Sequence, residues 1–265
     1  MNILEKIVAE KRKEVEERKS LTPVKRLEGS IYFESPTVSL REYVKREDKI
    51  GLIAEIKRKS PSKGVINANV SVERTSIGYM QAGASGLSVL TDGPFFGGKT
   101  DDLITARNFN YCPILRKDFM IDEYQLIEAK SMGADVILLI AAVLSPEEIK
   151  ALSEVAQTLG LEVLLEVHSQ EELQRSMMPS IDLLGVNNRD LTTFVTDIHT
   201  SKELAEQIPD DFVKVSESGI SDPNVVVDLM HYGYKGFLIG EHFMQFGRPE
   251  KACRDFVKQV KKLVG

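Results

Sequence analysis

The fold is decided from residue 51 onward, where the sequence GLIAEIK (51–57) opens a series of short apolar or β-branched runs. Amphipathic stretches separate these runs, and several of the stretches end in Gly-Ala or Leu-Gly, which stop a helix just before the next strand. This alternation is typical of β-α units and a parallel sheet. The eight runs are GLIAEIK (51–57), GLSVLTD (86–92), CPILRKD (112–118), DVILLIAAV (135–143), LEVLLEVHS (161–169), DLLGVNNR (182–189), FVKVSES (212–218) and GFLIGEH (236–242).

Eight β-α units close naturally into a barrel, and a length of 265 residues is typical of one such barrel. We therefore predict an α/β protein, a (β/α)8 TIM barrel with an N-terminal helical extension. Residues 1–265 are expected to form a single domain, with residues 1–50 as the extension and residues 51–265 as the barrel. The alternative is an open doubly wound sheet, but no Gly-x-Gly-x-x-Gly motif follows any strand, which removes the usual dinucleotide-binding interpretation.

The extension begins with a candidate helix, whose partial apolar stripe at helical spacing consists of Ile3, Leu4, Ile7, Val8 and Val15. Beyond residue 8 this segment is dominated by lysine, arginine and glutamate, which is expected of a face exposed to solvent. The stretch from residue 20 to residue 48 is richer in turn residues and less periodic. We interpret it as a connection into the barrel.

The composition excludes several classes of function. The net charge is −6, and the basic residues are interleaved with acidic ones, so we expect no nucleic-acid partner. The longest apolar run, residues 136–144, is too short to span a bilayer, and the N-terminus lacks the apolar core of a secretion signal. The two cysteines, Cys112 and Cys253, cannot form a disulfide framework. We expect a cytoplasmic protein that does not bind membranes.

Polar side chains follow several of the strands, at the points where these strands end. Because active sites of such barrels lie at the carboxyl ends of the strands, we expect these side chains to meet. Each of them alone is explained equally well by an exposed strand end or a salt bridge at the rim. As a group, they allow Lys57 and Lys117 to hold a substrate carboxylate and donate a proton, and Glu166 to accept one. The side chains are Glu55, Lys57, Arg116, Lys117, Asp118, Glu166, Asn187, Asn188, Arg189, Ser216, Glu217 and Ser218.

A phosphate site is the second expectation. Barrels often bind phosphate with the loops after the last two strands, where Gly219 and Gly240 allow a ligand to approach the backbone. Arg189 supplies a bidentate cation nearby, although either glycine alone is as well explained by a turn. No metal site is expected, because the four histidines show no ligand spacing and read as surface or packing residues. They are His168, His199, His231 and His242.

Several motifs resemble those of the indole-3-glycerol phosphate synthases, and they fall in the order that this family shows. The resemblance covers essentially the whole chain, and its first motif is very specific. The motifs are IAEIKRKSPS (53–62), LSVLTD (87–92), FFGG (95–98), PILRKDF (113–119), LEVH (165–168), GVNNRDL (185–191), SESGI (216–220) and FLIGE (237–241).

The resemblance implies a ring closure in tryptophan biosynthesis. The substrate, 1-(2-carboxyphenylamino)-1-deoxyribulose 5-phosphate, loses carbon dioxide and water to give indole-3-glycerol phosphate. Lys117 matches the general acid, Lys57 the lysine that holds the carboxylate, Glu55 its partner and Glu166 the base. The aromatic ring can accept the electrons of the departing carboxylate, so no cofactor is expected. Asn187 and Ser218 match the residues that orient the substrate in this family.

The resemblance also implies a phosphate grip built from Ser60, Arg189, Gly219 and Gly240, with the backbone at Glu241 beside it. One departure from the family pattern is visible. After Gly240 and Glu241 the family usually has a small residue, whereas this chain has His242.

Two alternatives remain open. One is another phosphosugar barrel, such as phosphoribosylanthranilate isomerase, which would pair a catalytic cysteine with an aspartate. Neither Cys112, at the start of a strand, nor Cys253, in the last helix, suits that role. The other alternative is a non-catalytic barrel that binds a phosphorylated ligand. It explains Arg189 and the glycines, but gives no reason for two lysines and a glutamate around one opening.

Overall fold

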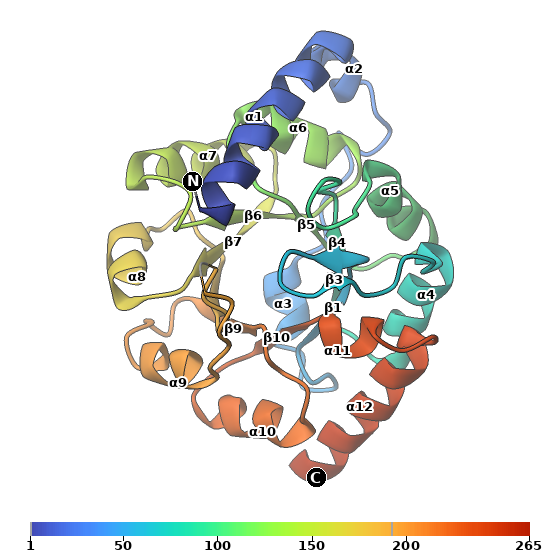
Figure 1. Cartoon of the computed structure of the whole chain (residues 1–265), viewed down its shortest axis with the longest axis vertical. Coiled ribbons are helices and arrows are strands. Elements are labelled where there is room, and N and C mark those ends of the chain that lie inside the picture. The colour runs from blue at the N-terminus through green and yellow to red at the C-terminus, as the bar shows by residue number, and fades with distance from the viewer. Residues whose placement is uncertain (1, 192) are drawn as a thin grey trace.

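Each of the eight apolar runs contains one strand in the computed structural model, which describes residues 2–191 and 193–265. These strands close into a parallel barrel in the order β1-β10-β9-β8-β7-β6-β5-β4 (Figure 1). The predicted (β/α)8 architecture is therefore confirmed. The strands are β1 (Leu52–Ile56), β4 (Gly86–Leu90), β5 (Ile114–Lys117), β6 (Val136–Ile140), β7 (Glu162–Val167), β8 (Leu183–Asn187), β9 (Val213–Glu217) and β10 (Gly236–Ile239).

Helices surround the barrel, and many of them begin at a capping side chain. Ser71, Asp122, Ser145, Ser169 and Asp222 each accept a hydrogen bond from a backbone N–H of the first helical turn. No helix among the described residues has the length and apolar character needed to cross a membrane. The helices after β1 are α4 (Val72–Ala82), α5 (Thr100–Phe109), α6 (Glu123–Ser131), α7 (Pro146–Thr158), α8 (Gln170–Ser176), α9 (His199–Ala205), α10 (Pro223–His231), α11 (Glu241–Met244) and α12 (Pro249–Val264).

Two apolar cores result from the alternation of side chains along each strand. One core lies between the strands and the surrounding helices, where Leu52, Ala54 and Ile56 of β1 pack. The other fills the barrel interior, with Ile53, Leu115 and other side chains of the opposite parity. Because the interior is packed rather than hollow, a ligand can enter only above its last apolar layer.

The N-terminal extension covers both ends of the barrel. It comprises α1 (Ile3–Leu21), α2 (Val24–Glu28) and α3 (Leu40–Val44). Leu40 and Val44 of α3 belong to the interior core. The Glu162 carboxylate, at the start of β7, accepts the backbone N–H groups of Leu40 at 2.8 Å and Arg41 at 3.0 Å. In Figure 1, α3 lies behind the barrel opening, and α1 runs on the near side along the edge of the barrel, beside α6.

The helix predicted at the N-terminus is confirmed, but the expectation that its charged residues face solvent is wrong for Lys11. This side chain is only 1% exposed, and its ammonium lies 2.8 Å from Asp118, 3.1 Å from Asp92 and 2.7 Å from Glu14. Although burial opposes the charge, the two aspartates outweigh it and raise the pKa of Lys11. A buried cation between carboxylates therefore fixes α1 to the ends of β4 and β5.

We predict that Lys11→Met lowers the free energy of unfolding by about 3 kcal/mol, because it leaves Asp92 and Asp118 buried without their cation. Urea titration would measure the change. The matched control is Lys13→Met on the same helix, where the side chain is 75% exposed and pairs only with Glu10. We expect that control to differ from the wild type by less than about 0.5 kcal/mol. Equal effects of the two substitutions would contradict the role given to Lys11.

Candidate functional site

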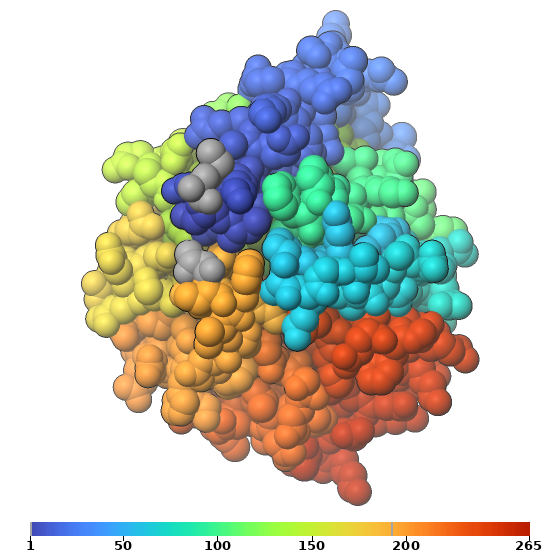
Figure 2. All heavy atoms as spheres, viewed as in Figure 1, coloured from blue at the N-terminus to red at the C-terminus, as the bar shows by residue number. Residues whose placement is uncertain are grey.

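A cavity of about 400 Å³ opens at the carboxyl ends of the strands. In Figure 2, this face of the molecule is bordered by α1 in dark blue, by the segment after β1 in cyan and by the C-terminal region in red. Arg116, Asn188 and Ser216, three of the strand-end residues expected at the site, do not line this cavity. The residues for which a catalytic or phosphate-binding role is predicted all line it, although these roles remain predictions. They are Glu55, Lys57, Ser60, Lys117, Glu166, Asn187, Arg189, Ser218, Gly219, Gly240 and Glu241.

Strand parity explains why these residues meet. In a strand, residues two apart point to the same face, so each functional residue continues the line of an interior apolar residue. Glu55 follows Ile53, Lys117 follows Leu115 and Glu166 follows Leu164, each by two positions. Glu217 likewise follows Val215, and Asn187 follows Leu183 by four positions. The polar ring is thus the last layer of the barrel interior.

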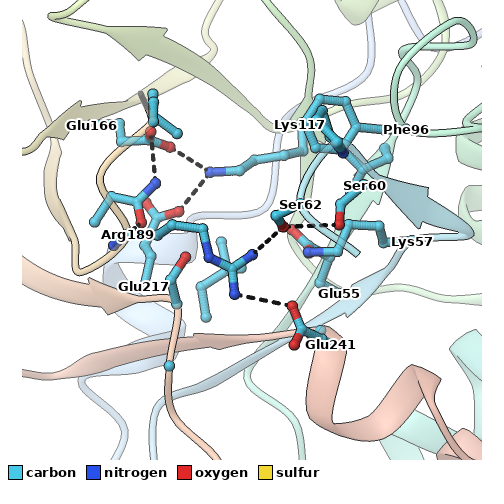
Figure 3. Close-up of a pocket in the computed structure, with 18 of the residues that line it drawn as sticks. Glu55, Lys57, Ser60, Ser62, Phe96, Lys117, Glu166, Arg189, Glu217 and Glu241 are labelled. Atoms are coloured by element: carbon cyan, nitrogen blue, oxygen red, sulfur yellow. Dashed lines mark hydrogen bonds and ion pairs between the residues drawn. The ribbon is translucent and has the colours of Figure 1, made fainter. Parts of the chain in front are cut away.

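Lys117 lies at the centre of this ring. Its ammonium donates to Glu166 of β7 at 2.8 Å and to Glu217 of β9 at 2.6 Å. Figure 3 shows Lys117 extending across the cavity to both carboxylates. Asn187 donates to the other oxygen of Glu166 at 3.0 Å, so that each Glu166 oxygen has a donor.

Burial and neighbouring charges shift the pKa values of the two glutamates that share Lys117 in opposite directions. For Glu166, burial opposes ionisation, but the Lys117 and His168 charges outweigh it and lower the pKa to about 2. For Glu217, burial raises the pKa to about 7, and the charge of Glu166 adds to this effect while Lys117 opposes it. Glu217 Oε1 is buried and accepts no hydrogen bond within the described part of the chain. One carboxyl of the pair is therefore a ready proton acceptor near neutral pH, and the other is firmly ionised.

A second ion pair lies on β1 and just beyond it. Lys57 lies 2.7 Å from Glu55 Oε1, as their shared parity predicts, and Ser88 donates to the other Glu55 oxygen at 3.3 Å. A Cβ on Gly240 would lie 2.5 Å from Glu55 Oε1, and one on Gly185 would lie 2.5 Å from Glu217 Oε1. These two glycines therefore leave the space that the glutamates occupy, a reason for Gly240 that differs from the ligand contact expected from the sequence.

Arg189 lies at the opposite side of the opening, where it faces the hairpin formed by β2 (Lys59–Ser60) and β3 (Gly64–Val65). Its guanidinium donates to Ser62 Oγ at 3.0 Å and to Glu241 Oε2 at 3.0 Å (Figure 3). Ser62 is in turn 3.3 Å from Ser60 Oγ. The Arg189 fork and two hydroxyl groups thus converge on one polar corner, a donor set that suits an anion.

The backbone after β9 turns sharply beside this corner. Ser218 and Gly219 have φ values of 68° and 75°, in the left-handed region that a non-glycine residue rarely adopts. A Cβ on Gly219 would lie 2.5 Å from Thr196 Cγ2, so glycine is also required there for space. Local strain of this kind is concentrated at functional sites.

The remaining wall of the cavity is apolar. Ile3, Leu4 and Ile7 of α1 line it together with the rings of Phe96 and Phe119, whose centroids are 6.1 Å apart. The extension therefore contributes directly to the site, which the sequence did not predict. An elongated ligand with an aromatic end and an anionic end fits this division of the cavity.

Two of the histidines lie at or near the cavity, whereas the two cysteines do not. His168, interpreted from the sequence as a surface or packing residue, instead lies 3.4 Å from Glu166 Oε1. His242 lines the cavity, and its ring contacts Phe243, Phe246 and Phe256. Both cysteines are buried away from the cavity, and burial raises the pKa of the Cys112 thiol to about 12. Neither cysteine suits the isomerase alternative.

Glu217, Ser62 and α1 are the parts of the site whose roles the sequence did not reveal. Glu217 was visible as a polar residue at a strand end, and its parity with Val215 would have placed it in the interior. Arg116 and Asp118, from the same list of strand ends, have the opposite parity to Lys117. They pair outside the barrel, where Arg116 donates to Glu128 at 2.7 Å and Asp118 accepts from Lys11. No group of His, Cys, Asp or Glu in residues 2–191 and 193–265 has the arrangement of a metal site.

Comparisons with known proteins give a consistent result. A family model described as indole-3-glycerol phosphate synthase matches residues 4–256. The chain is 49% identical over 259 residues to the indole-3-glycerol phosphate synthase of Bacteroides thetaiotaomicron, which covers 98% of this chain and 99% of that relative. It is 41% identical over 261 residues to that of Caldanaerobacter subterraneus subsp. tengcongensis, which covers 98% and 99%. The solved structure of thiamine phosphate pyrophosphorylase from Pyrococcus furiosus, 17% identical, superposes with a TM-score of 0.61 over 86% of this chain and 100% of that chain, which shows the fold alone.

We predict that Glu217→Gln changes the pH dependence of stability. Because the folded-state pKa of Glu217 is raised to about 7, the folded protein holds a proton that the unfolded chain has already lost above pH ~4.5. This contribution to stability is present at low pH and is lost as the pH rises to about 7. Glutamine does not titrate, so the stability of the variant relative to the wild type should rise by about 2 to 3 kcal/mol between pH 5 and pH 8.

Urea titration of both proteins across this pH range would measure the difference. Glu154→Gln, at an exposed site on α7, is the matched control and should show no such trend. A constant difference between Glu217→Gln and the wild type at all pH values would contradict the raised pKa.

Proposed function

The chain belongs to the indole-3-glycerol phosphate synthase family, and we propose that the cavity described above carries out the ring closure with Lys117 as its acid and Glu166 as its base. The protein is a carboxy-lyase of tryptophan biosynthesis. The observation that supports these roles most directly is the Lys117 ammonium held between Glu166 and Glu217 at the end of the barrel interior. A barrel that only bound a phosphorylated ligand would have no use for that arrangement.

The division of the cavity indicates how the substrate lies. Its phosphate is placed at Arg189, with Ser60 and the backbone at Gly219, Gly240 and Glu241 around it. Its carboxyphenyl ring lies against the apolar wall formed by α1 and the two phenylalanine rings. This pose brings the ring carboxylate to Lys57 and the ketone between ring and phosphate to Lys117. Holding both ends folds the chain between them, which supplies the proximity that ring closure requires.

In the first step the ring carbon that carries the carboxylate attacks the ketone carbon, and Lys117 gives its proton to the ketone oxygen. A lysine between two carboxylates is a weak acid, so the transfer depends on the negative charge that develops on this oxygen during attack. Carbon dioxide then leaves from the tetrahedral ring carbon, and the electron pair of the broken bond restores the aromaticity of the benzene ring. The ring itself receives the electrons, so the proposed route needs no cofactor.

In the second step Glu166 takes a proton from the carbon beside the ring nitrogen, and the neighbouring hydroxyl group leaves as water with a proton from Lys57, which the loss of carbon dioxide has freed from the substrate carboxylate. Lys117 and Glu166 are coupled, because the Lys117 charge is a main reason that the pKa of Glu166 is low. Once Lys117 has given up its proton, that charge is gone and Glu166 becomes a stronger base. The acid and the base therefore act in the order that the reaction needs. Asn187, bound to Glu166, and Ser218 orient the substrate.

Three further features belong to this proposal. We propose that residues 1–265 act as one domain, since α1 and α3 of the extension contribute to the cavity wall and to the interior core. We also propose a cytoplasmic location, because both cysteines are unpaired and buried. The proposed partner is the phosphorylated small-molecule substrate, and no nucleic-acid partner is proposed.

We predict that mixing the protein with 1-(2-carboxyphenylamino)-1-deoxyribulose 5-phosphate in buffer containing EDTA produces indole fluorescence. Lys117→Met should lower turnover by about 10²- to 10⁴-fold, the range for loss of an acid–base group, while calorimetry still detects substrate binding. Lys150→Met, at an exposed site on α7, is the control and should keep wild-type turnover. Substrate binding by the wild type without any rise in fluorescence would favour the non-catalytic alternative.

We predict that Arg189→Met weakens the inhibition by inorganic phosphate by about 10- to 100-fold, the effect of losing one or two hydrogen bonds to a charged group. The inhibition constant would be measured against the substrate at fixed pH and ionic strength. Arg254→Met, on the exposed face of α12, removes a positive charge far from the cavity and serves as the control. Equal inhibition constants for the two variants would remove Arg189 from the phosphate site.

A further inference from the structure

His168 stands directly behind the proposed base, outside the cavity lining. It follows β7 and is two residues beyond Glu166, so it continues the same side of the strand. Its side chain is 13% exposed, and its Nε2 lies 3.4 Å from Glu166 Oε1. It is not among the residues that line the cavity, so it contacts Glu166 from the side away from the substrate.

A second carboxylate fixes the orientation of this ring. Glu172, in the first turn of α8, accepts the backbone N–H of His168 at 2.7 Å, and the same oxygen lies 3.3 Å from His168 Nδ1. The backbone of Glu172 is held by Ser169 Oγ at 3.2 Å. A carboxylate beside Nδ1 keeps the proton on that nitrogen, which leaves Nε2 as the atom directed at Glu166.

The protonation state of His168 then follows from its neighbours. A neutral ring with its proton on Nδ1 would present a lone pair to the Glu166 carboxylate, whereas an imidazolium presents an N–H to it. Nε2 is buried and has no hydrogen-bond partner within the described residues, so Glu166 is the acceptor nearest to it. Although burial opposes the charge, Glu172, Glu166 and Glu217 outweigh it and raise the pKa of His168.

The other charged groups around the pair favour the same state. Lys117, which opposes a second positive charge nearby, is itself shared between Glu166 and Glu217. Although burial opposes ionisation of Glu172, the hydrogen bonds and charge of His168 lower the pKa of that carboxyl, and Arg175 of α8 adds to this effect while its guanidinium donates to the Ala141 carbonyl at 2.6 Å. Glu172 therefore stays ionised at neutral pH and remains a partner for the imidazolium.

We infer that His168 is a positioning residue which, as an imidazolium between Glu172 and Glu166, holds Glu166 ionised with Oε1 directed away from the substrate and Oε2 directed at Lys117 and the substrate. Glu166 Oε1 already accepts from Asn187, and the imidazolium of His168, with Nε2 3.4 Å from the same oxygen, adds a positive charge beside it. Oε2, which accepts from Lys117, is thus the oxygen that faces the substrate. When Lys117 gives up its proton, His168 is the positive charge that remains beside the base. This inference rests on the proposed synthase reaction.

The test is the pH profile of kcat for three variants compared with the wild type. His168→Leu removes the ring donor, and we expect kcat to fall by about 10-fold with little change in KM, the effect of one lost charge-assisted hydrogen bond. His168→Gln keeps a donor but cannot titrate, so kcat should recover and the fall of activity at alkaline pH that belongs to His168 should disappear. Glu172→Gln removes a carboxylate that raises the pKa of His168, so that fall should move to lower pH.

The outcomes separate the two proposals. If the wild type is active and its alkaline fall lies at the same pH in Glu172→Gln and His168→Gln, the role of His168 is overturned and the proposed function stands. A purely structural role would lower the melting temperature of His168→Leu and leave the position of that fall unchanged in Glu172→Gln. Absence of product from the wild type would overturn the proposed function and this inference with it. If the His168 variants failed to fold, the shift in Glu172→Gln would still decide the question.

Discussion

Desolvation of the charged residues in the last layer of the barrel interior is the constraint on which the site depends. Removing an ion from water costs several kcal/mol unless an opposite charge lies within hydrogen-bond range. The strands meet this condition by pairing Lys117 with Glu166 and Glu217, and Lys57 with Glu55. Each group then has the partner that allows it to be buried. These pairs also set which groups hold protons, so a structural requirement fixes the acid–base properties of the site.

The same constraint governs the attachment of the extension. The residues at the end of β5 belong to two charged networks, since Lys117 points into the cavity, while Arg116 pairs with Asp118, which also borders the cavity. The second network joins Asp118 to Lys11 of α1, and Arg116 to Glu128 of α6. Because α1 also supplies apolar side chains to the cavity, the attachment through Lys11 is part of the site. A barrel without the extension would lose one wall of the cavity and the Lys11 cation that pairs with Asp92 and Asp118, just beyond β4 and β5, although Asp118 would keep Arg116 at 3.5 Å.

How much of this could be read from the sequence depends on the range of the interaction. The strands follow from local apolar runs, and the site residues follow from the rule that they lie at the ends of those strands. Parity alone also places Glu55 and Lys57 together. The burial of Lys11 could not be predicted, because it depends on how α1 crosses β4 and β5, far away in the sequence. The position of His168 beside Glu166 could not be predicted for a related reason, because it depends on the direction in which α8 presents Glu172.

Substrate binding must rearrange these ion pairs, because the substrate adds negative charge to a site whose charges are already paired. Glu55, Glu166, Glu217 and Glu241 face four cations at the opening, namely Lys57, Lys63, Lys117 and Arg189. The substrate brings a carboxylate and a phosphate of about −1.5 to −2 charge into this balanced set. We propose that Arg189 then turns from Glu241 to the phosphate, and Lys57 from Glu55 to the substrate carboxylate. The protein carboxylates released in this way lie in a more negative environment, which favours protonation. Glu217, whose pKa is already raised to about 7, is the group best placed to take up that proton. The free site is thus an arrangement of charges in which protein carboxylates occupy the positions that substrate anions later take.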